Sequence, residues 1–465
     1  MNNFIKKNWI LMNIIFVLLI VLYQLMKNLV FHSGLIIEKS SPLIFNIYGF
    51  LLLLFGIGSL FFMLHKAENK ILNISFLVLG YSSICLGYIL QKDPGLKWEG
   101  SDVAWTNYNL AKEVVDYGPL FIVDTWNNRA NPFDSVGYNP IAKAQTRKTI
   151  EENKINWLSG NRWDIRNLPV DKFNNRPYIH PPLAPIIMGE WLSIFPISRF
   201  SLQTFMIVIN LFAFIILMVL FKEDLVNDNG FYLLLFSIIT TPVAILFFAP
   251  SEDQLTMILT GLSVIILYKK TEESSFYPFI SGILIGLAFY TKFIVAFYIF
   301  FQLMSLIFFY KNFSIKPFIG YLTGLLLVFI TFTAFGYYFW LTILIGIKVA
   351  NTYAREHPIT FLRSILDFAY FGPSFLLILI LLIIKLFNKA KDFKFFFITV
   401  PLLFGIGIYC ILAWKLGTFN RYLFVFVMAL FPFLFSSIKS IDFKKKDILI
   451  TLFSNFLLLV LIMYF

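Results

Sequence analysis

Two neighbouring acids, Glu252 and Asp253, lie in a very short polar gap between two long apolar runs. A charge at the centre of a membrane-spanning helix costs roughly 2.5 to 3.5 kcal/mol, and less near the end of the helix. The pair is therefore expected to have partners and a catalytic function, because a carboxylate can take a proton from a hydroxyl group. The simpler alternative is that both carboxylates reach water and cap a helix that begins at about residue 254.

A third acid, Asp102, begins a segment with the pattern of an amphipathic helix. Residues 101–118 place apolar side chains on roughly one helical face: Val103, Leu110, Ala111, Val114 and Val115. Ser101 is a suitable N-cap, and Gly118-Pro119 is a suitable stop. In the first turn the helix dipole keeps a carboxylate ionised while its oxygens face solvent or substrate. Asp102 is a candidate general base, unless it is merely an acid that starts the helix.

Three cations occupy places that favour phosphate binding. Two prolines fix the backbone directly after His180, so the imidazole is presented rigidly near the lipid headgroups, although a lone histidine is more often structural. Arg421 begins a predicted helix, where its guanidinium can fork onto phosphate oxygens. Lys292 is predicted at an outer turn, below the membrane surface. Further cations are predicted on the same face: Lys348, Arg355, Arg363 and Lys415.

The composition indicates that these groups are positioned by a membrane protein. Of the 465 residues 59% are hydrophobic and 14% are charged, whereas globular proteins have about 25% charged residues. A soluble enzyme and a disordered chain are thereby excluded. The net charge of +12 does not indicate nucleic-acid binding, because Lys and Arg mostly fall in short gaps between apolar runs. Both cysteines, Cys85 and Cys410, lie inside apolar runs, which excludes a disulfide framework.

The apolar runs predict an all-α polytopic membrane protein of about thirteen transmembrane helices. Runs long enough to span roughly 30 Å of hydrocarbon occur at about 9–31, 43–64 and 71–90, and resume at 202–221, 231–249, 254–268, 277–310, 317–347, 365–387, 395–414, 419–438 and 448–465. Three parts follow: the first three transmembrane helices (1–90), an extracytoplasmic loop with juxtamembrane helices (91–201), and the remaining transmembrane bundle (202–465).

The lysines predict which side each loop faces. With a cytoplasmic N-terminus, far more of them fall in cytoplasmic loops than in short outer loops, and the 91–199 loop lies outside. Residues 277–310 must then cross twice, with Lys292 at the outer turn, and residues 181–199 must lie along the membrane surface. Most of the nine tryptophans fall in the large loop and its exit helix, where they can anchor the chain at the interface or pack on a sugar.

These motifs resemble the GT-C membrane glycosyltransferases. The chain is similar to the branch of protein O-mannosyltransferases and lipid A aminoarabinose transferases in its Asp102, Tyr108, Ala111 and Gly118 and in the His-Pro-Pro-Leu sequence at 180–183. Further matches are Ser-Glu-Asp-Gln-Leu at 251–255, the Gly-rich stretch 282–288 that leads to Thr291-Lys292, and Arg421-Tyr422. The motifs stand in the family order over about 90–430.

The resemblance implies a GT-C-like bundle that moves a sugar from a polyprenyl-phosphate-linked donor. It implies that Asp102 acts at the acceptor, and that His180, Arg421, Tyr422 and Lys292 lie near the donor phosphate. The chain departs from the family in having three helices before the large loop, and Val103 where an acid usually follows the first Asp.

The chemical requirements of sugar transfer favour the same function. Transfer from a prenyl phosphate needs a base for the acceptor hydroxyl, whereas the leaving phosphate is a stable anion that needs cations. A direct displacement of this kind inverts the anomeric centre. No cofactor is required, although Asp102 and Asp253 are able to share a divalent cation if they converge. The expected partners are the lipid-linked donor, a lipid, glycan or protein acceptor, and the lipids of the cell membrane, without nucleic acid.

Two alternatives remain open. A lipid-linked sugar flippase or transporter also needs many helices and intramembrane charges, but its site lies at the midplane, whereas the candidate groups here all fall on the outer face. An O-antigen-type polymerase shares the architecture with its large outer loop, but not the His-Pro-Pro-Leu sequence or the second acidic turn.

Overall fold

The computed structural model describes residues 7–19, 22, 46–65, 69–92, 108, 111–112, 114–116, 118–119, 181–221, 229–241, 252–270, 276–293, 295–309, 315–335, 371–388, 420–439 and 441–464. Every regular element within these ranges is a helix. After an N-terminal helix (Lys7–Leu19) come α2 (Ile47–His65), α3 (Lys70–Lys92), α7 (Leu183–Ile194), α8 (Arg199–Leu220), α9 (Asn229–Ile239), α11 (Glu252–Lys270), α12 (Phe276–Phe289), α13 (Val295–Phe309), α14 (Ile315–Ala334), α17 (Pro373–Asn388), α19 (Asn420–Ile438) and α20 (Lys445–Tyr464).

Several helices have the length and composition of membrane spans. Within the described part of the chain, 4 helices are long and apolar enough to cross a bilayer, at Ile47–His65, Ile71–Leu90, Phe200–Leu220 and Ile315–Ala334. Apolar side chains on their outer faces are exposed, for example Phe55 on α2 and Ile330 on α14. A soluble protein rarely exposes such surfaces, whereas lipid covers them. The all-α membrane character predicted from the sequence is therefore confirmed for the described residues. The count of about thirteen transmembrane helices stays a prediction, since the predicted run 395–414 and most of the 91–201 loop lie outside these residues.

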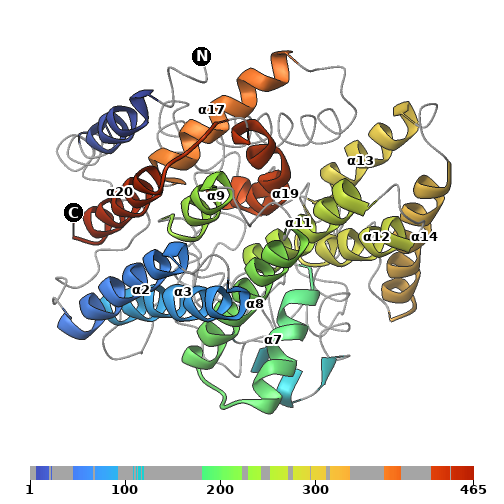
Figure 1. The fold of residues 1–465 in the computed structure, drawn as a ribbon. Helices are drawn as coiled ribbons and strands as arrows, with labels where there is room; N and C mark the ends of the chain where they lie inside the picture. The colour runs from blue at the N-terminus through green and yellow to red at the C-terminus, as the bar shows by residue number, and fades with distance from the viewer. Residues whose placement is uncertain are drawn as a thin grey trace.

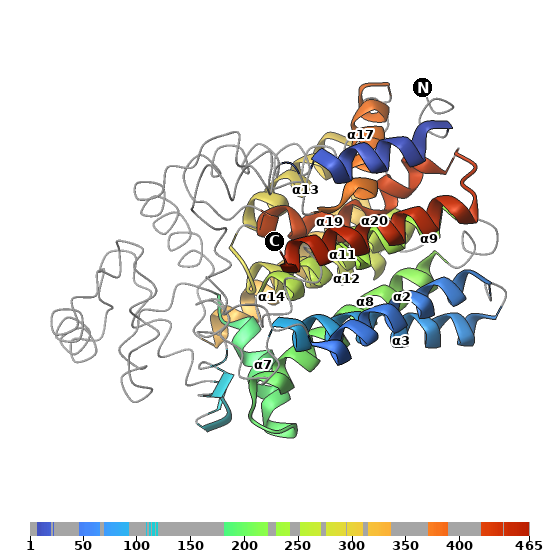
Figure 2. The same cartoon turned by 90° about the vertical axis from the view of Figure 1, so that its left-hand side faces the viewer.

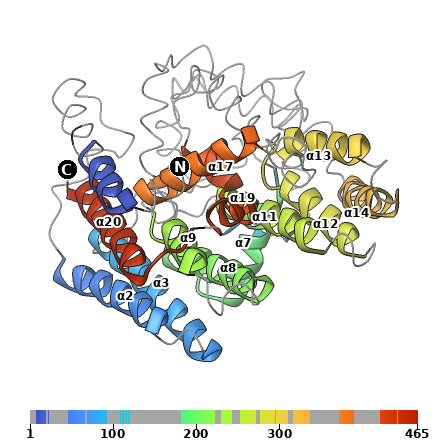
Figure 3. The ribbon, with the colours of Figure 1, turned by 45° about the horizontal axis from the view of Figure 1, so that its top comes forward.

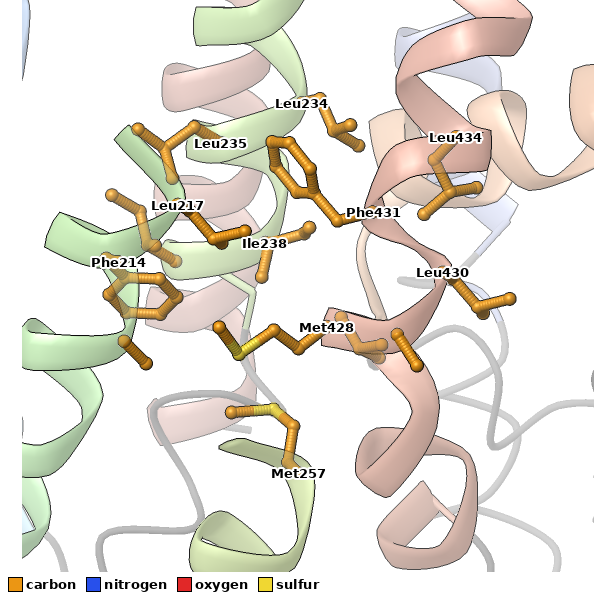
Figure 4. Close-up of a cluster of buried hydrophobic side chains, with 14 of the residues drawn as sticks. Phe214, Leu217, Leu234, Leu235, Ile238, Met257, Met428, Leu430, Phe431 and Leu434 are labelled. Carbon is orange, nitrogen blue, oxygen red and sulfur yellow. The ribbon is translucent and has the colours of Figure 1, made fainter. Parts of the chain in front are cut away.

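The helices form one bundle with a dense centre. In Figures 1 and 3, α2 and α3 lie on one side, α12, α13 and α14 lie on the other, and α8, α9, α11 and α19 lie between them. Figure 4 shows the centre, where side chains from four helices meet: Phe214 and Leu217 (α8), Leu234, Leu235 and Ile238 (α9), Met257 (α11), and Met428, Leu430, Phe431 and Leu434 (α19). This core fixes α11 and α19, whose first turns carry candidate site residues.

The relative directions of the helices follow from their contacts. Thr256 contacts Thr291 and Ser263 contacts Ser281, so α11 and α12 are antiparallel. A Cβ added at Gly261 would lie 2.6 Å from Cβ of Met428, and Tyr268 packs on Phe433, so α11 and α19 are parallel. These directions are those that the predicted order of crossings requires.

Small residues bring α12 and α14 into close contact. A Cβ added at Gly282 would meet the backbone carbonyl of Tyr321, and one added at Gly324 would meet that of Phe279. Close approach of this kind is typical of membrane helices, where packing replaces the hydrophobic effect. The tight pair fixes the position of α12, whose C-terminal turn leads into Lys292.

One sequence prediction about short helices is confirmed, and the prediction that residues 181–199 lie along the membrane surface stays a prediction. Residues 277–310 form two helices, α12 and α13, with Lys292 in the turn between them. The helix α7 has 12 residues, which gives about 18 Å at 1.5 Å per residue, too short to cross the bilayer. Figure 2 shows α7 at one end of the bundle, beside the short helical pieces near residues 108–119.

One boundary differs from the sequence prediction. The helix expected from about residue 254 begins at Glu252, so both acids lie within its first turn. Carboxylates in the first turn are favoured by the partial positive charge of the unpaired backbone N–H groups there, which extends the helix by two residues.

Candidate active site

The acidic turn lies at the start of α11 and is buried. The side chain of Glu252 is 1% exposed and that of Asp253 is 0% exposed. The alternative that both carboxylates reach water is therefore wrong. One of the two negative charges is compensated inside the protein, because the Lys292 ammonium forms an ion pair with Asp253 and lies 3.9 Å from Oε1 of Glu252.

Lys292 is held in a tight turn directly after α12. The backbone N–H groups of Thr291 and Lys292 both donate to the carbonyl of Ala288 at 3.0 Å, and the hydroxyls of Thr291 and Thr256 lie 2.7 Å apart. The Lys292 side chain is 5% exposed. The predicted placement of Lys292 at a turn between short helices is confirmed, and its ammonium lies against two carboxylates inside the bundle.

The Pro-Pro-Leu segment docks onto the same turn. The backbone N–H of Leu183 donates to the carbonyl of Tyr290 at 3.0 Å, two residues before Lys292. Leu183 and Ala184 are buried where α7 begins. The first turn of α7 is therefore attached to the end of α12 beside the ion pair. His180, which precedes this segment, lies outside the described residues.

The start of α19 lies at the same end of the bundle. Because Gly261 of α11 packs on Met428 of α19, heights along the two parallel helices can be compared. Asp253 lies about 12 Å before Gly261, and Arg421 about 10 Å before Met428, at 1.5 Å per residue. The backbone of Arg421 is thus close to the level of Asp253, and the side chains of Arg421 and Tyr422 lie outside the description.

The segment predicted to follow Asp102 also reaches this end. Tyr108, Ala111 and Val114 are in helical conformation, and Ala111 joins a buried cluster with residues of α7, α8 and α11. These partners are Ala184, Met188, Leu192, Leu202, Phe205, Met206 and Leu255. Gly118 ends the helical turn with a positive φ of 82° and donates to the carbonyl of Val114, as its sequence predicted. Asp102 itself lies outside the described residues.

The structure thus brings together three of the motifs that the sequence places far apart. The acidic turn, the Thr291-Lys292 turn and the Pro-Pro-Leu segment are in direct or consecutive contact, and the backbone of Arg421 lies near their level. Sequence reasoning missed Tyr290, which contributes only its carbonyl, and Thr256. Thr256 stands four residues after Glu252, a spacing that puts both on one face of a helix, and this spacing is the sequence pattern that predicts Thr256 near the acidic turn.

The divalent cation that Asp102 and Asp253 would share stays a prediction, because Asp102 lies outside the described residues. Among these residues, no three His, Cys, Asp or Glu side chains gather in a way that suits a metal ion. Within the described residues, Oδ1 of Asp253 contacts the Lys292 ammonium.

The sequence was compared with known families, proteins and structures. Residues 179–338 match the family model of the dolichyl-phosphate-mannose-protein mannosyltransferases. Neither the curated proteins nor the solved structures give a match. The matched segment begins just before Pro181 and contains both the acidic turn and Lys292. The match confirms the predicted resemblance: over about a third of its length this membrane protein is similar to the dolichyl-phosphate-mannose-protein mannosyltransferases, glycosyltransferases of the GT-C type.

Proposed function

We propose that the protein is a cell-membrane glycosyltransferase that moves a sugar from a polyprenyl-phosphate-linked donor to an acceptor on the extracytoplasmic face. The observation that carries this proposal is the family match over 179–338, whose motif residues meet at one end of the bundle. A lipid-linked donor suits this arrangement, because its tail can remain in hydrocarbon between apolar helices while its phosphate and sugar lie at the helix ends.

In this proposal Asp102 is the general base. It takes the proton of the acceptor hydroxyl, the acceptor oxygen forms a bond to the anomeric carbon, and the bond from that carbon to the phosphate oxygen breaks. The phosphate leaves as an anion with the electron pair, so no general acid is needed. Attack opposite the leaving group inverts the anomeric centre.

The donor phosphate is held by cations at the outer headgroup level. His180 and Arg421 are the candidates whose backbones are fixed, the first by Pro181-Pro182 and the second by the start of α19. Support comes from the docking of Leu183, three residues after His180, on the carbonyl of Tyr290, and from the backbone of Arg421, which lies close to the level of Asp253. Tyr422 is assigned to the same phosphate site as Arg421.

The matched family is named for mannose and for protein acceptors. We extend to this chain the use of a lipid-linked sugar, and we propose a lipid, glycan or protein as the class of acceptor. A panel of donors that differ only in the sugar is the direct way to identify the specificity of the site.

The test incubates purified protein with polyprenyl phosphates that carry different single sugars, together with a membrane extract as acceptor source. Transfer releases free polyprenyl phosphate, which mass spectrometry separates from the intact donor. We expect release with at least one sugar and an inverted configuration in the product. A flippase would instead move intact donor across a vesicle membrane without release, and that result would refute the proposal.

A further inference from the structure

The ion pair between Lys292 and Asp253 stands at the contact between three helices. Asp253 belongs to the first turn of α11, Lys292 follows α12, and the carbonyl of Tyr290 in the intervening turn accepts the backbone N–H at the start of α7. The hydroxyl contact between Thr256 and Thr291, at 2.7 Å, joins α11 to the same turn. Nothing in this arrangement directs the Lys292 ammonium to solvent, since its side chain is 5% exposed.

A buried charge pair of this kind responds sharply to the loss of one partner. Removing the Lys292 ammonium leaves two carboxylates uncompensated in a low-dielectric interior, which destabilises the protein far more than the loss of an exposed pair does. Removing the Asp253 carboxylate leaves Lys292 with Glu252, whose Oε1 lies 3.9 Å away. The turn after α12 must then move or admit water to solvate the remaining charge. The backbone N–H at the start of α7 donates to the carbonyl of Tyr290 in that turn, so a displaced turn loosens the start of α7, while Met188 and Leu192 keep the rest of the helix packed on α8.

We infer that Lys292 and Asp253 are positioning residues, whose ion pair fixes the turn that holds the start of α7. Its consequence for catalysis rests on the proposed function. The pair serves transfer by holding the Pro181–Leu183 segment in place. It does so without touching the donor phosphate or the acceptor hydroxyl. This assignment differs from the phosphate-binding role that the sequence suggests for Lys292, and a charge swap separates the two.

The structural part is tested without any substrate, by distance measurements between two spin labels in the full-length protein. One label replaces exposed Glu190 on α7, and the other replaces exposed Ile330 on α14. Helix α14 reports the position of α12, because the two helices pack closely at Gly282 and Gly324. We expect a narrow distance distribution in the parent and a broadened one for Lys292→Met, with a smaller broadening for Asp253→Asn because Glu252 still faces Lys292. An unchanged distribution in Lys292→Met overturns the inference.

The charge swap Asp253→Lys with Lys292→Asp is the decisive variant. It keeps two acids and one lysine in the cluster, with Glu252 unchanged, and should restore the narrow distribution. The matched control is Lys385→Met, which removes another interhelical lysine, one that donates to the carbonyl and hydroxyl of Ser436 between α17 and α19. This control should leave the distance between α7 and α14 unchanged. If Lys292→Met does not accumulate, Thr256→Val removes the hydroxyl contact with Thr291 and the hydrogen bond to the carbonyl of Glu252 but leaves the ion pair, and it should give a smaller broadening.

Kinetics then distinguishes positioning from direct contact. Lys292→Met should raise the donor KM by about tenfold or more, which corresponds to about 1.4 kcal/mol of donor binding, with a smaller effect on the acceptor KM. The swap should recover most of that loss, which is not expected if the ammonium at position 292 binds phosphate, because an aspartate there repels it. If the parent is active, and the swap variant recovers the parent's distances but not its transfer activity, the inference is overturned. Absence of transfer by the parent itself refutes the proposed function alone, and the distance measurements still decide the inference.

Discussion

The contact between α12 and α14 predicts a large effect from a single methyl group at Gly282. A Cβ at this position would meet the carbonyl of Tyr321 and lie 2.9 Å from the backbone nitrogen of Leu325. Both neighbours are backbone atoms of α14 and cannot rotate away. The helices would have to separate by on the order of 1 Å to reach ordinary carbon contact distances of about 3.5 to 4.0 Å.

The expected free energy combines two opposing effects. Overpacking costs about 1 to 3 kcal/mol, whereas replacing a helical Gly by Ala gains roughly 0.5 to 1 kcal/mol from backbone entropy. Gly282→Ala is therefore expected to destabilise the protein by about 1 kcal/mol, within a range of about 0 to 2.5 kcal/mol. Gly58→Ala on α2 is the matched control, because a Cβ there meets nothing within 4 Å, and it should instead stabilise slightly.

The measurement is unfolding of the purified protein by SDS in mixed micelles, followed by tryptophan fluorescence. The two variants should shift the midpoint in opposite directions. Equal stability of Gly282→Ala and Gly58→Ala would show that α12 does not approach α14 as closely as described. Because α12 carries the turn with Lys292, the Gly282 variant should also broaden the α7 to α14 distances.

Three further outcomes are expected. Asp102→Asn should reduce transfer by about 100-fold or more, the loss typical of a general base, with unchanged expression. The control Asp116→Asn changes an exposed acid on the same predicted helix and should retain activity. A transfer rate of Asp102→Asn above about a tenth of the parent rate excludes Asp102 as the base. Arg421→Lys should weaken donor binding in a direct binding assay, since lysine lacks the planar fork of the guanidinium, and Arg421→Ala should weaken it more. If Arg421→Ala binds the donor as the parent does, the phosphate is bound elsewhere. Reporters fused after Gly160 and after Lys391 should read extracytoplasmic and cytoplasmic, and the reverse pair would invert the topology.

The sequence alone predicts much of what lies at the ends of the helices. Apolar runs and their lysines indicate a helical membrane protein, and the shortness of the segment before Lys292 indicates a turn between two short helices. The acidic pair and the Pro-Pro-Leu segment are visible because charges and consecutive prolines are unusual in apolar sequence. These features depend on local composition and length, which a single sequence contains in full.

Which of these residues meet is decided by the tertiary structure. Lys292 and Asp253 stand 39 residues apart, and their pairing depends on the rotation of α11 and α12 about their own axes. That rotation is set by packing elsewhere, through Ser263 on Ser281 and through the glycine contact of Gly282. The attachment of α7 cannot be predicted from the sequence, because the Leu183 N–H donates to the backbone carbonyl of Tyr290. Every residue carries a backbone carbonyl, so no residue type indicates this hydrogen bond.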